Sequence, residues 1–245
     1  MKKIKKNNFS FFIKKPYVIF EIENFLDKET FERLKYSFPS EINFPNDEKL
    51  KSKKIFDENN INYNNFIDNN LDWKEFLNQF SEKKNVSNMF NFSLMENIKN
   101  RGIRFVKKWT TKETNHFSRF FFRKINFTSY FALQNQDQVV YPHTDARTKL
   151  VSMIYYISGD IGGGTEFWNV KKNIKKWKNW KNNHLKNDND INEFKADSEL
   201  IRKSEFIENK LVGFIKTDLS WHSVLDVGKI DKEGHRKTIN LFYRY

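Results

Sequence analysis

The chain has 245 residues, and its 26 Phe, 9 Tyr and 6 Trp supply enough large side chains for a packed core although only 38% of the residues are apolar. It contains no cysteine, which excludes disulfides, thiolate metal sites and cysteine nucleophiles. The formal net charge of +13 would favour a nucleic-acid partner if the basic residues formed one patch, but Lys is spread through almost every polar stretch.

No segment approaches the roughly 20 apolar residues of a membrane span. Near the start, the apolar run at 11–13 is broken by Lys14 and Lys15, which makes it too short for the core of a signal peptide. We therefore expect a cytoplasmic protein without a membrane partner.

Two helix starts are visible in the first hundred residues. Asp27 is placed to cap a helix in the segment ENFLDKETFERLKYSF, and Asp72 with Glu75 resembles a capping box in LDWKEFLNQF. We expect a third helix around 89–98. Residues 1–116 are thus interpreted as a helical N-terminal part of a single domain.

From about residue 117 the chain changes to short segments rich in aromatic and β-branched residues, which is typical of strands. Several short strands without helices between them favour a sandwich, a barrel or a jelly roll over residues 117–245. We expect strands near 119–126, 128–134, 138–143, 149–158, 165–170, 211–216, 221–226 and 236–244.

A polar, Lys- and Asn-rich segment at 171–209 interrupts the strand series and is interpreted as an insertion. We expect it to be partly helical and to lie against the sheets through Trp177, Trp180 and Phe194. Its position leaves two interpretations, a solvated surface excursion or a substrate lid, because long loops in compact domains are often functional.

His143 and Asp145 are two residues apart in VVYPHTDARTKL, so on an extended strand both side chains leave the same face and can hold one metal ion. Alone, such a pair is also what a polar surface segment would show. His222 follows in the apolar setting LSWHSVLD, where a single His could equally be a core residue bonded to the backbone. Two His and one carboxylate on one side of an iron ion leave the open positions that oxygen activation requires.

Arg236 begins the segment RKTINLFYRY, in which Arg236 and Thr238 share one strand face. A guanidinium directed into a barrel is costly unless it meets an anion, and its planar fork suits a carboxylate. His235 and Lys237 alternate with Arg236 and should face away from the site. Glu166 falls near the expected mouth of the pocket, where it would be a substrate contact or a rim residue.

Taken together, these segments resemble the 2-oxoglutarate and Fe(II)-dependent dioxygenases, especially the prolyl-4-hydroxylase-like branch. The matching segments run in the family's order and are PHTD, KLVSMIYYIS, GGGTEFW, SWHSV and RKT. The segment NFLDKETFERL is also similar to the helix that precedes the catalytic domain in this branch. The resemblance covers most of the chain except roughly 40–100 and 171–209.

The resemblance implies a mainly β fold with N-terminal helices, built on a double-stranded β-helix, the jelly roll also found in cupins. It implies that His143, Asp145 and His222 are the catalytic Fe(II) ligands, with 2-oxoglutarate and O2 as co-substrates. The reaction would be hydroxylation of a C–H bond with formation of succinate and CO2. Halogenating relatives carry a small residue in place of the carboxylate, so Asp145 favours hydroxylation.

The resemblance also implies a co-substrate site. Arg236 and the Thr238 hydroxyl would bind the distal carboxylate of 2-oxoglutarate. Tyr130 resembles a tyrosine that supports this carboxylate, and it is equally interpreted as an ordinary core tyrosine.

Two other functional classes stay open from the sequence. One is a non-enzymatic jelly-roll binding module, against which the intact triad and Arg236 argue. The other is a basic nucleic-acid-binding protein, for which the chain offers no RNP-type strand, zinc-finger pattern or helix-turn-helix pattern. We expect a small-molecule or peptide substrate as partner, while the oligomeric state is not determined by the sequence.

Overall fold

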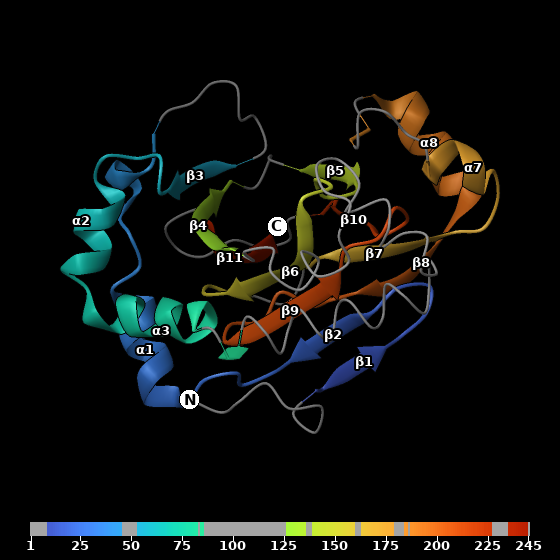
Figure 1. Ribbon diagram of the computed structural model, residues 1–245. Helices are drawn as coiled ribbons and strands as arrows, with labels where there is room; N and C mark the ends of the chain where they lie inside the picture. The colour runs from blue at the N-terminus through green and yellow to red at the C-terminus, as the bar shows by residue number, and fades with distance from the viewer. Residues whose placement is uncertain are drawn as a thin grey trace, which may run out of the picture.

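The computed structural model in Figure 1 describes residues 9–45, 53–82, 84–85, 126–135, 139–159, 163–178, 184–185, 187–226 and 235–244. The third expected helix, Trp180 and nearly all of the strand expected at 119–126 lie outside the described residues.

The fold is mainly β and consists of two antiparallel sheets. The larger sheet has the strand order β1-β2-β9-β6-β11-β4-β3, and the smaller sheet has the order β5-β10-β7-β8. The strands are β1 (Phe11–Ile13), β2 (Ile19–Ile22), β3 (Lys54–Asp57), β4 (Asn126–Gln134), β5 (Val140–His143), β6 (Lys149–Tyr156), β7 (Glu166–Val170), β8 (Ser198–Lys203), β9 (Lys210–Ile215), β10 (Trp221–Val224) and β11 (Arg236–Arg244).

The two faces of the larger sheet have different partners because side chains alternate along each strand. One face of β4, β6 and β11, including Phe131, Tyr155 and Leu241, packs against helices in the main hydrophobic core. The opposite face turns toward the smaller sheet, where Phe167 of β7 contacts Phe214 of β9 with ring centroids 5.7 Å apart. In the larger sheet, only side chains on this second face can therefore line the space between the two sheets.

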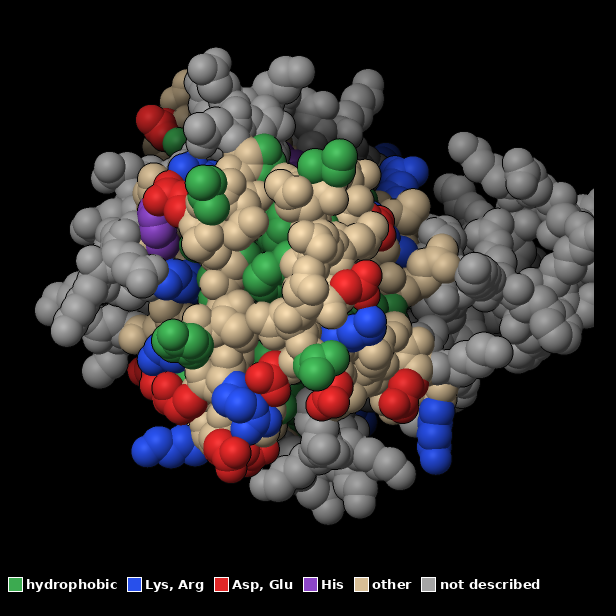
Figure 2. Space-filling view, turned by 90° about the vertical axis from the view of Figure 1, so that its left-hand side faces the viewer, with side chains coloured by type: hydrophobic (Ala, Val, Ile, Leu, Met, Phe, Trp, Pro, Cys, Tyr) green, Lys and Arg blue, Asp and Glu red, His purple; other side chains and the backbone are tan. Residues whose placement is uncertain are grey.

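Three N-terminal helices cover the outer face of the larger sheet on one side of the molecule (Figure 1). They are α1 (Lys28–Tyr36), α2 (Tyr63–Asp68) and α3 (Leu71–Ser81). Trp73 of α3 packs edge-on against Phe131 of β4, with ring centroids 4.8 Å apart. On the surface that these helices form, exposed hydrophobic side chains are scattered among polar groups and form no continuous patch (Figure 2).

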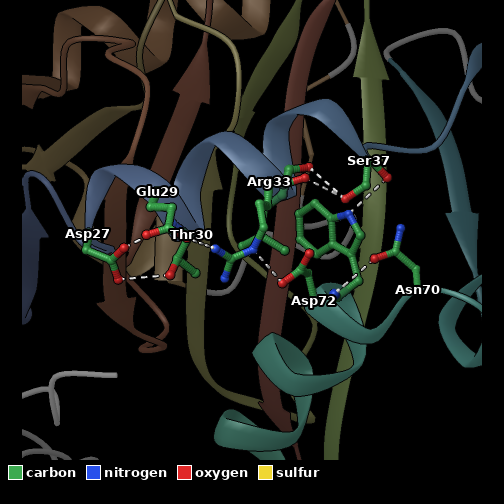
Figure 3. Close-up of polar contacts among 9 residues, drawn as sticks. Asp27, Glu29, Thr30, Arg33, Ser37, Asn70 and Asp72 are labelled. Atoms are coloured by element: carbon green, nitrogen blue, oxygen red, sulfur yellow. Dashed lines mark hydrogen bonds and ion pairs between the residues drawn. The ribbon is translucent and has the colours of Figure 1, made fainter.

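The helix starts agree with the sequence at one position and differ at another (Figure 3). Asp27 caps α1 as predicted, and its carboxylate accepts from the Thr30 backbone N–H at 2.9 Å. The expectation that Asp72 caps α3 is wrong, because the N-cap is Asn70. Asp72 lies within the first turn, where its carboxylate is free to reach Arg33 of α1 at 3.0 Å and so joins the two helices.

The interpretation of residues 1–116 as purely helical is incomplete. Strands β1 and β2 extend the larger sheet through pairing of β2 with β9, and β3 pairs with β4 at the other edge. These strands are short: β1 pairs with its neighbour β2, whereas β2 and β3 are strands because they pair with segments more than seventy residues away. A local hydrophobic pattern does not carry that information.

The insertion contains helices α7 (Ile174–Lys178) and α8 (Asp188–Asp197), followed by β8, which forms the edge of the smaller sheet. Trp177 and Phe194 are buried and pack on Trp221 of β10, with ring centroids 5.8 and 4.8 Å away. The predicted docking of the insertion by aromatic side chains is therefore confirmed for these two residues. No helix among the described residues is long and apolar enough to cross a membrane.

Replacing Gly213 tests the packing of β2 on β9. Phe20 is the cross-strand partner of Gly213, and a Cβ built on Gly213 would lie 2.2 Å from the Phe20 ring. We expect Gly213→Ala to lower the free energy of unfolding by about 2 kcal/mol, measured in urea, because overpacking forces the ring to move. The loss should shrink in a Phe20→Leu background, and an equal loss in both backgrounds would contradict this packing.

Candidate metal centre and its cavity

The two histidines of the predicted triad come from adjacent strands of the smaller sheet. His143 at the end of β5 is the cross-strand partner of His222 in β10, and their ring centroids are 4.1 Å apart. Asp145 follows two residues after His143 and is buried. The ligating atoms of the three side chains all lie within 4.8 Å of one another. The predicted convergence on one metal-sized space is therefore confirmed as geometry.

The backbone orients both imidazoles. The Nδ1 of His143 lies 2.9 Å from the carbonyl oxygen of Tyr141, and the Nδ1 of His222 lies 3.1 Å from that of Ser220. Because a carbonyl only accepts, each Nδ1 carries the hydrogen, and each Nε2 keeps a free lone pair. This is the arrangement in which a histidine is held ready to bind a metal through Nε2.

Burial also keeps these imidazoles neutral. It lowers the pKa of His222 from 6.5 to about 4, and it lowers the pKa of His143 well below 6.5, with His222 and His184 adding to the effect. Burial alone would raise the pKa of Asp145, but the charge and hydrogen bond of Lys149, together with the two neighbouring histidines, outweigh it and hold that pKa below its usual range. At pH 7 the site therefore offers two neutral nitrogens and one carboxylate, the forms that bind metals.

Two donors hold the Asp145 carboxylate in place. Lys149 donates to Oδ1 at 2.6 Å, and the Ser152 hydroxyl donates to Oδ2. Lys149 begins β6 and its ammonium also lies 3.7 Å from the ring centroid of Phe242. A ligand carboxylate supported in this way keeps a fixed orientation.

The triad lines one side of a cavity of about 60 Å³ between the two sheets. The opposite wall comes from alternate residues of the larger sheet, as strand geometry requires. Those residues are Tyr130, Ala132 and Gln134 of β4, Ser152 and Ile154 of β6, Phe214 of β9, and Arg236, Thr238, Asn240 and Phe242 of β11.

Arg236 points into this cavity, and the register predicted for the last strand is confirmed. Its Nη1 donates to the Gln134 side chain at 2.9 Å, and its guanidinium lies 4.3 Å from the Phe206 ring centroid. Nε and Nη2 are buried without a hydrogen-bond partner among the described residues. Buried donors of this kind are rare in native proteins and indicate a missing acceptor.

Thr238 and Tyr130 also line the cavity. The Thr238 hydroxyl accepts from the Asn240 side chain at 3.3 Å, and the Tyr130 hydroxyl accepts from Lys53 at 2.7 Å. The sequence did not single out Lys53, which lies just before β3 and reaches the cavity because β3 pairs with β4.

Other candidate residues lie outside the cavity. The Nε2 of His235 contacts Glu41 at 3.2 Å, away from the triad, as expected from strand alternation. Glu166 is buried and accepts from the Ser223 hydroxyl at 2.6 Å, so it supports a cavity residue and is not on the rim. His184 of the insertion is exposed, but its ring stacks on His143 with centroids 4.4 Å apart. The insertion therefore touches the metal centre directly.

No protein-family model matches the sequence, and no curated protein matches it significantly. Solved structures that match include oxygenases. A prolyl-4-hydroxylase from Pseudomonas putida has 12% identity and a TM-score of 0.44, with 94% of this chain and 93% of that chain covered. HygX from Streptomyces hygroscopicus, with nickel and 2-oxoglutarate bound, has 8% identity and a TM-score of 0.49, with 92% and 82% covered. A viral collagen prolyl hydroxylase from Paramecium Bursaria Chlorella virus-1 has 14% identity and a TM-score of 0.40, with 92% and 95% covered.

The depressed pKa of His222 makes the stability of the metal-free protein depend on pH. Below about pH 6.5 the unfolded chain protonates this imidazole, whereas the folded protein does so only near pH 4. The unfolded state binds more protons in this window, so stability falls as the pH falls from 6.5 to 4. We expect Tm to decrease over this range and to decrease less in His222→Gln. Equal slopes in a thermal unfolding series would contradict the assignment.

Proposed function

We propose that the protein is a 2-oxoglutarate and Fe(II)-dependent dioxygenase that hydroxylates a C–H bond. One observation carries this proposal: the His143, Asp145 and His222 cluster shares a cavity with Arg236, a buried cation that lacks partners for two of its donors. A metal centre next to an unfilled carboxylate receptor matches a co-substrate that is both a chelator and a dicarboxylate.

The three ligands fit iron by their chemistry. The set consists of two imidazole nitrogens and one carboxylate oxygen, and the chain contains no thiolate to favour a softer ion. Ligand atoms within 4.8 Å of one another can meet one ion at roughly 2.0–2.2 Å after small side-chain rotations. Iron bound there would supply the oxidising chemistry, coupled to conversion of 2-oxoglutarate and O2 into succinate and CO2.

The protein's own residues bind and orient the reactants. Arg236 would receive the distal carboxylate of 2-oxoglutarate on its free Nε and Nη2 donors, with the Thr238 hydroxyl beside it. Phe206 and Tyr156, whose rings lie within 5.3 Å of the guanidinium carbon, exclude water from this pair. A charge-assisted pair in a dry setting is stronger than the same pair in water.

The two sheets support the proposed double-stranded β-helix. In such a jelly roll, two facing antiparallel sheets enclose a site between them. Here the smaller sheet contributes His143 and His222, and the larger sheet contributes the wall that carries Arg236. Under the proposal, the metal ligands would lie opposite the carboxylate receptor, so a molecule that bridges them would lie within the cavity.

Removing the carboxylate ligand tests the metal centre. We expect Asp145→Ala to reduce succinate formation from 2-oxoglutarate by more than about 100-fold, which exceeds the usual loss from a merely supporting group. Iron bound by the purified variant should fall in parallel. Asp226→Ala is the matched control, because Asp226 is an exposed carboxylate paired with Lys203. Full turnover in Asp145→Ala would contradict the proposal.

Removing the guanidinium tests the co-substrate site. We expect Arg236→Gln to raise KM for 2-oxoglutarate about 10- to 100-fold, the range expected for loss of hydrogen bonds to a charged group. Binding of Mn²⁺ should stay within twofold of the wild-type protein, since Arg236 is not a metal ligand. An unchanged KM, or an equal loss of metal binding, would remove Arg236 from the proposed role.

A further inference from the structure

The cavity carries more positive charge than a metal centre and one co-substrate require. Among the described residues that line it, Lys53, Lys149 and Arg236 are cationic, and Asp145 is the one carboxylate. Fe(II) would add two positive charges and 2-oxoglutarate would remove two, so a surplus of two positive charges stays in the loaded site. Buried cations are costly unless an anion approaches them.

Lys53, like Arg236, forms no ion pair among the described residues. Its Nζ donates to the Tyr130 hydroxyl at 2.7 Å and lies 4.8 Å from the ring centroid. Burial lowers the pKa of Lys53 to about 8 and raises that of Tyr130 to about 12, so at pH 7 an ammonium faces a neutral phenol. Within the described part of the chain no carboxylate forms an ion pair with Lys53.

Each of the two lysines contacts one ring of an aromatic pair that lines the cavity, Lys53 the ring of Tyr130 and Lys149 the ring of Phe242. The Tyr130 and Phe242 rings, which the two ammonium groups flank, have centroids 5.4 Å apart. Arg236 is opposite Gln134, four residues along β4 from Tyr130, which is about 13 Å of strand. With the co-substrate on Arg236 and the triad, the Lys53 ammonium at the Tyr130 hydroxyl would still have no ion pair.

We infer that Lys53 binds a carboxylate or phosphate group of the primary substrate, so that the enzyme acts on an anionic molecule. The inference rests on the proposed function, because it takes Arg236 as the partner of 2-oxoglutarate. Tyr130 positions the Lys53 ammonium through the hydrogen bond to its hydroxyl. The anion would then lie next to the triad, where a neighbouring C–H bond of the same molecule can meet the metal.

The test uses the full chain loaded with Mn²⁺ and saturated with 2-oxoglutarate, and calorimetry measures the binding of acetate and of inorganic phosphate. We expect at least one of the two anions to bind the wild-type protein, and the preferred anion distinguishes a carboxylate from a phosphate substrate. Lys53→Met should weaken that binding at least tenfold, and Lys53→Arg should retain most of it. Lys54→Met is the matched control, because Lys54 is the next residue and pairs with Glu41 outside the cavity.

The affinity for 2-oxoglutarate distinguishes a Lys53 that binds the substrate from a Lys53 that belongs to the co-substrate site. It should stay within twofold in Lys53→Met, and a loss as large as that in Arg236→Gln would show that Lys53 belongs to the co-substrate site and overturn the inference. Absence of anion binding to the loaded wild-type protein would overturn it as well. If 2-oxoglutarate fails to bind the wild-type protein, the proposed function fails, and Lys53-dependent anion binding to the Mn²⁺ form still decides whether the anion site exists.

Discussion

The register of β11 between β4 and β6 determines the chemistry of the cavity. Arg236, Thr238, Asn240 and Phe242 face the smaller sheet only because Ile239, Leu241 and Tyr243 are packed into the helical core on the other face. The Tyr243 hydroxyl further donates to the backbone of Phe80 in α3 at 2.9 Å. A slip of one residue would exchange these two sets, turning Lys237 into the cavity and Arg236 toward the helical core. The N-terminal helices therefore fix which face of β11 lines the cavity, although they pack against the opposite face.

The smaller sheet depends in the same way on the insertion. Trp221 is fully buried under Trp177 and Phe194, and its neighbour His222 consequently turns toward the cavity. Trp177 is itself held by a hydrogen bond from its Nε1 to Asp197 at 2.7 Å, which joins the two helices of the insertion. His184 then brings the same segment onto the ring of His143. The insertion thus packs against the strand that carries His222 and stacks on His143, and its role as a substrate lid stays a prediction.

The sequence predicts the parts of the site that depend on short spacings. The alternation of Arg236 with Lys237 follows from strand geometry, and His143 and Asp145 meet as their two-residue spacing predicts, although β5 ends at His143 and Asp145 lies just beyond it. Lys53 and His184 could not be predicted, since each reaches the site through pairing between distant segments, β3 with β4 and His184 with His143. The N-cap of α3 differed from the predicted Asp72 for a related reason, because Asp72 instead pairs with Arg33 of another helix. Tertiary contacts decide these positions.

Charge couples the proposed metal centre to Lys53 and Lys149, the two lysines that line the cavity. Without a metal, the Asp145 carboxylate is neutralised by the Lys149 ammonium at 2.6 Å. Under the proposed function, a divalent cation on Asp145 would repel that ammonium at close range, where the low dielectric of the interior strengthens the repulsion. Lys149 would then lose its anion at the moment the metal binds, and only the face of Phe242 would remain as its partner. Lys53 already lacks an ion pair, so metal binding would leave two ammonium groups at the aromatic pair of Tyr130 and Phe242 without a carboxylate. The site would therefore bind an anionic substrate more strongly after the metal has bound than before.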